Sequence, residues 1–222
     1  MIDLKSYEAV IFDMDGVLID SEPLWKIAME EVFHSVGCFI TKKDFQNTVG
    51  LRIDEVILYW YENVGWGDCS VKEVEDKIIH RMIVLIQQNG APLTSVLEPL
   101  EYLRSRGVKI GLGTSSYTVL IETVLNTLAI TEKFDFVHSA ENEEFGKPHP
   151  AVYLTVAKKL DVHPSKCLVI EDSLNGILSG QAAGMKVVCI PEKTHHPEPK
   201  LNQAEFMFED MNALLESIKL NS

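Results

Sequence analysis

Apolar runs that end in polar residues recur along this chain, and the first run ends most abruptly. Residues 9–12 are apolar with two β-branched members, which predicts a buried strand. Asp13, Asp15 and Gly16 follow at once. If the backbone stays extended through residue 15, both carboxylates project to one side, because side chains two apart on a strand share a face. Two such anions repel unless a hard cation, here Mg2+, lies between them. A surface turn whose aspartates cap the next helix is the alternative.

Residues 20–90 show helical spacing of apolar residues and no convincing strand. Cap residues, prolines and glycines predict the helix boundaries. The predicted helices run from Ser21 and Pro23 to Gly37, from near Thr41, from Ile53 to Asn63, and from the capping box Ser70/Glu73 to near Gly90. This block is too long for one crossover connection, so it predicts an inserted helical domain.

From Ala91 onward helices alternate with strands. The predicted strands are Val108–Gly113, Phe134–His138, Cys167–Ile170 and Lys186–Ile190. The predicted helices run from a capping box at Ser95 and Glu98 to Gly107, from about Tyr117 to Leu128, after Pro150, and up to Gly184. This alternation predicts an α/β fold with a doubly wound parallel, Rossmann-like sheet. We expect a core domain at 1–19 and 92–222, a small helical cap at 20–91, and a flexible stretch at 195–200.

Composition narrows the class of protein. The chain has 222 residues, of which 46% are hydrophobic, enough for a main domain with a smaller one. A net charge of −13 without a basic cluster argues against nucleic acid or an anionic membrane as partner. No apolar run approaches the ~20 residues of a membrane span, and no signal-peptide pattern precedes the first strand, so the expected compartment is the cytoplasm. The 4 cysteines lack a C-x-x-C spacing and are expected to be reduced core residues. A monomer is the default expectation.

Three of the predicted strands end in polar side chains. Thr114 and Ser115 follow one of them and Glu171 and Asp172 another, in addition to the aspartates after the first. In an open parallel sheet, ligands bind at the carboxyl ends of the strands, so these groups are expected to meet at one edge. Asp172, with Asp13 and a backbone carbonyl near residue 15, would form an oxygen shell for Mg2+, with Glu171 supporting it.

A phosphate group suits the remaining residues of this edge. Thr114 and Ser115 stand at a strand-to-helix turn, where a hydroxyl and free N–H groups make an anion seat, although an ordinary helix cap is the alternative. Pro148 and Pro150 restrict the backbone next to Lys147, so this lysine is expected to be held in place at the site. An ordinary surface lysine is the alternative. No Walker-type glycine loop is present, so a carboxylate is the natural nucleophile. One aspartate would attack phosphorus, and the other would protonate the leaving alcohol and then activate water.

Four short motifs occur in order: Asp13-Met14-Asp15-Gly16, Thr114, Gly146-Lys147-Pro148 and Glu171-Asp172. In order and spacing they resemble the signature motifs of the haloacid dehalogenase-like hydrolase superfamily, over essentially the whole chain. Stretches at 20–25, 50–54 and 171–176 resemble its bacterial 2-deoxyglucose-6-phosphate phosphatase (hexitol phosphatase) branch. The second motif has Thr114-Ser115 where close relatives often have Ser-Ala, a departure expected to have no functional consequence.

The resemblance implies a role for each matched residue. Asp13 would be the nucleophile and Asp15 the acid/base. Thr114, Ser115 and Lys147 would hold the phosphoryl group, while Asp13, the Asp15 carbonyl and Asp172 would hold Mg2+. The implied function is a Mg2+-dependent phosphatase of small sugar or hexitol phosphates. Specificity is expected from the cap side, and the candidate residues are Glu22, Trp25, Arg52 and Ser116.

Each cap-side candidate also has an ordinary structural interpretation. Trp25 fits the apolar stripe of its helix, Glu22 a first-turn charge, Arg52 a solvated surface residue and Ser116 a helix cap. Among enzymes, a β-phosphoglucomutase-like phosphoryl transfer is the alternative, although that family places a histidine where this chain has Trp25. Dehalogenases lack the second aspartate, so Asp15 argues against them. A phosphoacceptor domain of receiver type is the alternative from another class.

Overall fold

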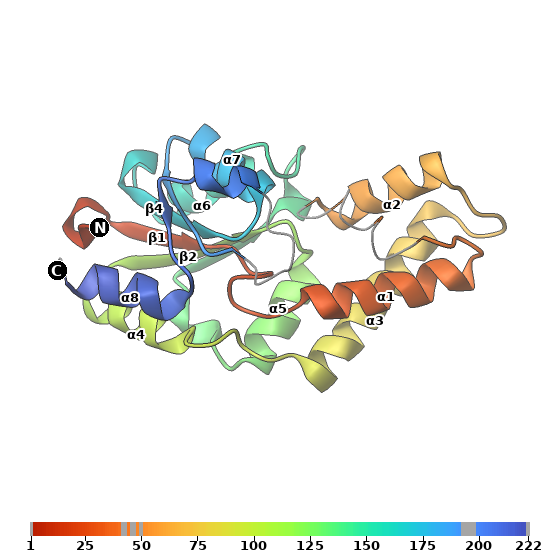
Figure 1. Cartoon of the computed structure of the whole chain (residues 1–222), viewed down its shortest axis with the longest axis horizontal. Helices are drawn as coiled ribbons and strands as arrows, with labels where there is room; N and C mark the ends of the chain where they lie inside the picture. Colours follow the sequence, from red (N-terminus) through yellow and green to blue (C-terminus); the bar gives the residue numbers. More distant parts are fainter. Residues whose placement is uncertain (1, 41–43, 45–47, 49–50, 192–198, 221–222) are drawn as a thin grey trace.

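The computed structural model describes residues 2–40, 44, 48, 51–191 and 199–220, and a six-stranded parallel sheet forms its centre (Figure 1). The strand order is β3-β2-β1-β4-β5-β6. The bounds are β1 Ala9–Phe12, β2 Lys109–Thr114, β3 Phe136–Ser139, β4 Cys167–Glu171, β5 Lys186–Cys189 and β6 Phe206–Met207. This order confirms the predicted doubly wound sheet. Strands β2 and β3 are added on one side of β1, and β4, β5 and β6 are added on its other side.

Helices cover both faces of the sheet, which is why β1 and β4 are buried along their whole length. Helices α4 (Leu97–Ser105), α5 (Thr118–Thr127) and α8 (Met211–Lys219) contribute to the core on one face. Helices α6 (Ala151–Lys159) and α7 (Leu174–Ala182) pack on the other face. Short 3-10 helices complete the described chain, at Leu4–Ser6, Thr131–Lys133, Ala140–Asn142, Pro164–Lys166 and Pro199–Gln203.

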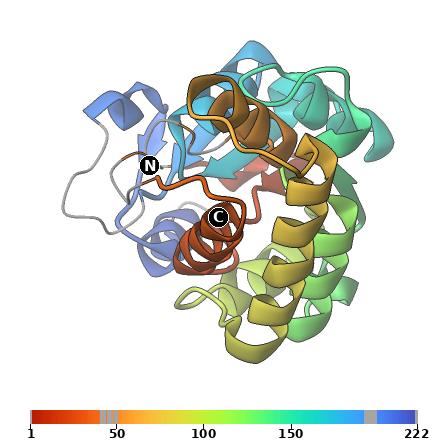
Figure 2. The ribbon, with the colours of Figure 1, turned by 90° about the vertical axis from the view of Figure 1, so that its right-hand side faces the viewer.

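In the described part of the insertion between β1 and α4, three α-helices form a cap beyond the carboxyl ends of the strands (Figures 1 and 2). They are α1 (Glu22–Ser35), α2 (Ile53–Asn63) and α3 (Val71–Asn89). Helix α3 packs against α1 and α2 within the cap and against α5 of the core. The two connections to the core lie side by side, since Ile19 pairs with Pro92 and the Leu93 N–H donates to the Leu18 carbonyl at 3.0 Å. The chain therefore enters and leaves the cap at one place.

Several predicted boundaries are confirmed and others are wrong. Helix α2 has the predicted bounds, and Ser70 caps α3. The capping box at Ser95 is wrong, because α4 begins at Leu97 and Ser95 has a φ of +63°, which is not a helical cap conformation. The predicted extension through residue 15 is also wrong, because β1 ends at Phe12 and the chain turns there. The predicted helix near Thr41 and most of the stretch 195–200 lie outside the described residues.

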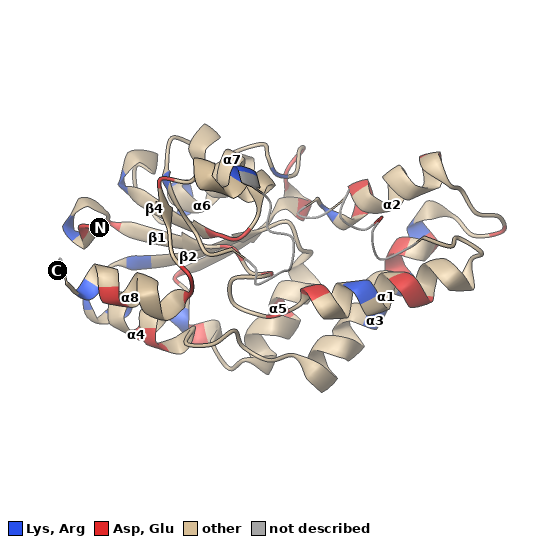
Figure 3. Cartoon of the chain, in the orientation of Figure 1, with Lys and Arg blue, Asp and Glu red and all other residues tan. Residues whose placement is uncertain are grey.

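The remaining expectations concern cysteines, charge and membranes. All four cysteines are free, and Cys38, Cys167 and Cys189 are buried while Cys69 is partly exposed. Lys and Arg are interspersed with Asp and Glu in Figure 3. Among the described residues, no helix has the length and apolar character needed to cross a bilayer.

Candidate active site

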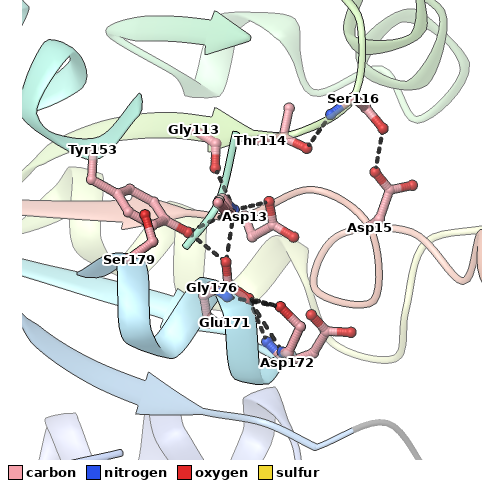
Figure 4. Close-up of polar contacts among 12 residues, drawn as sticks. Asp13, Asp15, Gly113, Thr114, Ser116, Tyr153, Glu171, Asp172, Gly176 and Ser179 are labelled. Atoms are coloured by element: carbon pink, nitrogen blue, oxygen red, sulfur yellow. Dashed lines mark hydrogen bonds and ion pairs between the residues drawn. The ribbon is translucent and has the colours of Figure 1, made fainter. Parts of the chain in front are cut away.

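Asp13 is the first residue after β1, and its carboxylate is 7% exposed at the carboxyl edge of the sheet. Lys147 Nζ donates to Asp13 Oδ1 at 2.8 Å and to Glu171 Oε1 at 2.7 Å. The same nitrogen lies 3.2 Å from the Gly113 carbonyl and 2.8 Å from the Tyr153 hydroxyl. One ammonium group therefore joins Asp13, Gly113, Tyr153 and Glu171, which Figure 4 shows close together.

The electrostatics of this cluster follow from burial and from the single cation. Burial opposes the charge of Lys147, but Asp13 and Glu171 together outweigh it and raise the pKa of the ammonium. Burial likewise opposes ionisation of Glu171, but Lys147 prevails and lowers the pKa of that carboxyl group. Burial raises the pKa of Asp13 to about 7, although Lys147 acts to lower it. The charged form of Glu171 is thus stabilised in the folded protein, whereas the charged form of Asp13 is disfavoured.

Asp172 brings a third carboxylate to the cluster. One oxygen each from Asp13, Glu171 and Asp172 lie within 4.8 Å of one another. Burial, followed by the charges of Glu171 and Asp13, raises the pKa of Asp172 well above its ordinary value. Glu171 is saturated, because its Oε1 bonds Lys147 and Tyr153 and its Oε2 accepts from Asp172 N, Ser173 N and Ser173 Oγ. Among the described residues, no group donates a hydrogen bond to the Asp172 carboxylate.

This donor set fits a hard divalent cation. Asp13 and Asp172 supply carboxylate oxygens that lack sufficient positive charge from the protein, and Mg2+ prefers such ligands. Glu171 is committed to Lys147 and to the backbone N–H groups of Asp172 and Ser173. Gly16 leaves room for the Asp172 carboxylate, because a Cβ at residue 16 would lie 2.0 Å from Asp172 Oδ2. Its φ of +71° also favours glycine.

Asp15 faces the same cavity but makes a separate set of contacts. Its Oδ1 accepts from Ser21 Oγ and, at 3.2 Å, from Trp25 Nε1 of the cap helix α1. Its Oδ2 accepts from Ser116 Oγ of the core at 2.6 Å. Figure 4 shows the Asp15 side chain directed toward Ser116 and away from Asp13 and Glu171. The turn after β1 therefore separates the two aspartates into two environments, one holding a lysine and one holding neutral donors.

The loop after β2 carries Thr114 and Ser115, the two residues that the sequence predicts as an anion seat. Thr114 is the last residue of β2, and its Oγ1 accepts from the Ser116 N–H at 3.1 Å, so its hydroxyl is already part of the turn. Ser115 lines the cavity next to it. Helix α5 begins at Thr118, and its N-terminus is therefore close to this loop.

A cavity of about 460 Å³ lies between the sheet edge and the cap. Its core side carries Asp13, Thr114, Lys147 and Asp172. Its cap side includes the apolar side chains of Trp25, Met29, Leu51, Ile53 and Val56 together with the charged Glu22 and Lys26. The cavity thus combines charged groups with apolar surface, which suits the binding of a small organic molecule.

Comparison with known proteins decides the family of this fold. The family model for haloacid dehalogenase-like hydrolases matches residues 10–190. Hexitol phosphatase B of Escherichia coli (strain K12) is 37% identical over 207 residues, which cover 93% of this chain and 93% of that protein. The chain belongs to the haloacid dehalogenase-like hydrolases. This membership confirms the resemblance and rules out the receiver-type alternative.

Two further proteins similar to this chain carry different functional names. A fructose-1-phosphate phosphatase of Escherichia coli (strain K12) is 30% identical over 190 residues, covering 83% of this chain and 96% of that protein. The crystal structure of β-phosphoglucomutase from Clostridium difficile is 28% identical with a TM-score of 0.84, and the match covers 97% of this chain and 96% of that one. Phosphatases and a mutase are thus both similar to this haloacid dehalogenase-like hydrolase.

The structure brings most of the predicted site residues to the cavity. Asp13, Asp15, Thr114, Ser115, Ser116, Lys147, Asp172, Glu22 and Trp25 all line it. Glu22 is paired there with Lys26 of the same helix. Trp25, expected as a specificity residue, donates to Asp15. Arg52 does not line the cavity, and its guanidinium contacts protein groups at the border between cap and core.

Two residues of the site were not predicted from the sequence. Tyr153 lies in α6, and its hydroxyl donates to Glu171 Oε1 at 2.6 Å. Its position three residues after Pro150 suggests only an ordinary buried aromatic. Ser21 was predicted as a helix start, which is correct, but its side chain makes no cap hydrogen bond and donates to Asp15 instead. Nothing in the local sequence distinguishes these uses from the ordinary ones.

Proposed function

We propose that this chain is a Mg2+-dependent phosphatase that hydrolyses monophosphates of small sugars or sugar alcohols through an aspartyl-phosphate. The observation that carries the proposal is the pair of aspartates in one cavity with different partners. Asp13 is oriented by Lys147, whereas Asp15 is held by Ser116 of the core, by Trp25 of the cap helix α1 and by Ser21, which immediately precedes that helix. Carboxylates in contrasting environments suit contrasting roles, here a nucleophile and an acid/base.

The first chemical step uses Asp13 as the nucleophile. Lys147 holds one oxygen of its carboxylate, and an Asp13 oxygen forms the new bond to phosphorus while the bond from phosphorus to the sugar oxygen breaks. Asp15 gives its proton to the departing oxygen, so the product leaves as a neutral alcohol. Hydrolysis reverses the roles: Asp15 takes a proton from water, the water oxygen bonds to phosphorus, and the bond from phosphorus to Asp13 breaks.

The phosphoryl group would be held by the sheet edge. Thr114, Ser115 and the N-terminus of α5 offer hydroxyl and N–H donors, and Lys147 supplies a fixed positive charge. Asp13, the backbone carbonyl of Asp15 and Asp172 would hold Mg2+, which supplies the positive charge that allows a phosphate dianion to approach these carboxylates. Glu171 fixes Lys147 and does not contact the reacting atoms.

The cap, assigned here to residues 20–91, would recognise the sugar. Its cavity wall includes the apolar side chains of Met29, Leu51 and Val56, with Glu22 and Lys26 at the rim. The paired connections at 16–22 and 89–95 form a narrow joint at which the cap can close over the substrate. The similarity to a hexitol phosphatase and a fructose-1-phosphate phosphatase supports a sugar or sugar alcohol as the leaving group.

The test is a steady-state comparison of kcat/KM over hexose, 2-deoxyhexose, hexitol and pentose monophosphates, with inorganic phosphate as the measured product. We expect release of phosphate from several of them, loss of activity after exhaustive EDTA treatment, and recovery with Mg2+. Asp13→Asn prepared in parallel measures any contaminating phosphatase. Full activity after EDTA, or no release of phosphate from any member of the set, contradicts the proposal.

A mutase is the second candidate, because the β-phosphoglucomutase structure matches nearly the whole chain. The two functions differ in the fate of the phosphoryl group, which a phosphatase gives to water and a mutase returns to a sugar. Incubation with β-glucose 1-phosphate separates them. A phosphatase gives inorganic phosphate and no net glucose 6-phosphate, whereas accumulation of glucose 6-phosphate establishes the mutase.

A further inference from the structure

Arg52 immediately precedes helix α2, at the border between cap and core. Its Nε and Nη2 donate to the two oxygens of Asp54 at 2.7 and 2.8 Å. Its Nη1 crosses to the core and donates to the carbonyls of Ala140 and Glu143 at 3.0 and 3.1 Å. The side chain is only 13% exposed and does not line the cavity. The guanidinium is therefore held by protein groups on both sides of the border.

The turn that Arg52 contacts, residues 139–143, is fixed firmly within the core. Ser139 Oγ donates to the Ser116 carbonyl at 2.7 Å and accepts from the Glu141 N–H at 3.0 Å. The Glu141 carboxylate accepts from the N–H and hydroxyl of Thr118 at the start of α5. The turn is thus bonded directly to the loop that carries Ser116, and Ser116 holds Asp15.

Glu143 anchors the other end of this turn. Its Oε1 accepts from Thr155 Oγ1 of α6 at 2.6 Å and lies 2.7 Å from His138 Nε2 of β3. The carbonyls of Ala140 and Glu143 therefore have fixed positions, and the Arg52 guanidinium that donates to them is fixed as well.

On the cap side, Arg52 belongs to the segment that forms the cavity wall. Leu51 and Ile53, its neighbours in sequence, both line the cavity. The Arg52 N–H donates to Glu55 Oε2 at 3.1 Å, which fixes the first turn of α2. Asp54 aligns the guanidinium through two parallel hydrogen bonds, a geometry that gives both strength and direction. Holding Arg52 in place therefore holds this part of the wall over the sheet edge.

We propose that Arg52 is a positioning residue that fastens the cap to the turn at 139–143, with Asp54 as its alignment partner, and that it is not a ligand of the sugar. Through this turn and Ser116 it fixes the cap relative to Asp15. The proposal relies on the proposed phosphatase function only where turnover is measured, because the fastening itself is a contact within the protein.

The test compares Arg52→Met, Asp54→Asn and the double variant with the wild type, using a hexitol phosphate and p-nitrophenyl phosphate. Loss of the guanidinium should lower kcat/KM for both substrates by a similar factor of about ten, the size expected of a hydrogen bond from a charged donor. Asp54→Asn should give a smaller loss, and the double variant should be no worse than Arg52→Met, because Asp54 acts only through Arg52. Arg81→Met is the matched control, since Arg81 bonds Glu31 wholly within the cap, and it should retain wild-type rates.

Hydrogen exchange provides a readout that does not need turnover. Amides of residues 139–145 and of the first turn of α2 should exchange faster in Arg52→Met and Asp54→Asn than in the wild type or Arg81→Met. The proposal is overturned if Arg52→Met affects the hexitol phosphate alone with unchanged exchange, or if the losses from Arg52→Met and Asp54→Asn simply add. If the wild type hydrolyses neither substrate, the phosphatase proposal fails, and the exchange experiment still decides the role of Arg52.

Discussion

Lys147 balances the charge of two buried carboxylates in this site. It is 3% exposed and bonds both Asp13 and Glu171, which come from neighbouring strands. Breaking a buried ion pair by removing one partner leaves an uncompensated charge, which is far more costly than losing an exposed pair. The stability of the sheet edge and the orientation of the proposed nucleophile therefore depend on the same ammonium group.

Lys147→Met should lower the free energy of unfolding by about 3–5 kcal/mol, because Asp13 and Glu171 then face each other without a cation. Tyr153→Phe is the matched control: it removes one hydroxyl bonded to Glu171 but keeps the lysine, and should cost about 1.5 kcal/mol. Urea denaturation measures both. A loss in Lys147→Met no greater than that in Tyr153→Phe would show that the ammonium is not the balancing charge.

At the level of single residues, the sequence identifies polar side chains at positions where an apolar or neutral residue is usual. Asp13 and Asp172 are predictable because carboxylates at the end of an apolar strand have few structural explanations. Tyr153 is not predictable, because its hydroxyl meets Glu171 only after α6 packs on the sheet. Arg52 could be assigned to the cap but not to its contacts, since its carbonyl partners lie 88 and 91 residues away in the chain.

Among the elements, helix α7 packs closely against Glu171. Its first turn passes Glu171, with Ser173 as the cap and Gly176 facing the carboxylate. A Cβ on Gly176 would lie 1.7 Å from Glu171 Oε1, so only glycine lets the helix come this near. The position of Glu171, and through it that of Lys147, is set by how closely α7 packs.

Gly176→Ala should therefore destabilise the protein by about 1–3 kcal/mol, the usual cost of forcing an extra carbon into a packed site. It should also lower kcat, because Glu171 must move and Lys147 with it. Gly67→Ala in the cap is the control, since no atom lies within 4 Å of its added Cβ, and it should change stability by no more than about 0.5 kcal/mol. Thermal unfolding and turnover rates test this prediction, and equal stability of the two variants would refute it.

Most elements with a periodic pattern of apolar residues could be predicted from the sequence, whereas β6 and α8, near the C-terminus, were not. Helix α3 was predicted by its capping box and apolar stripe, both local features. The two-residue strand β6 has no pattern to detect, and it exists because β5 offers an edge to pair with. Helix α8 was missed although Asp210 caps it and Met211, Leu214, Leu215 and Ile218 give it one buried face. Its signals are of the same kind as those of α3, so this helix could have been predicted from the sequence.

For the whole molecule, the arrangement of three carboxylates around one lysine links stability to pH and to cations. The pKa of Asp13 is raised to about 7 and that of Asp172 is also raised, chiefly by burial. An aspartate with a raised pKa keeps its proton in the folded protein at pH values where the unfolded chain has already lost it. The metal-free protein should therefore lose stability as the pH rises from about 4, the ordinary pKa of an aspartate, to about 7, the pKa of Asp13 in the folded protein.

Mg2+ should accordingly raise the melting temperature more at pH 8 than at pH 5. At pH 8 Asp13 is ionised and can bind the cation, whereas at pH 5 a proton competes for the same carboxylate. At a concentration about 100 times Kd, the shift at pH 8 should be about 5–10 °C. Calorimetry with and without Mg2+ measures it, and Asp172→Asn should reduce the shift. An equal shift at both pH values would argue that the cation binds elsewhere.

The most direct test of the account is to capture the phosphoryl group on Asp13. Asp15→Asn should still accept a phosphoryl group from p-nitrophenyl phosphate, whose leaving group needs little protonation, but should hydrolyse it slowly, because acid–base help is worth about 10²–10⁴-fold. Mass spectrometry of the acid-quenched protein should show the mass of one added phosphoryl group, located by fragmentation on Asp13 and absent from the Asp13→Asn/Asp15→Asn double variant. Release of phosphate by Asp15→Asn with no phosphoryl group on the protein, or with the group on another residue, would contradict the account.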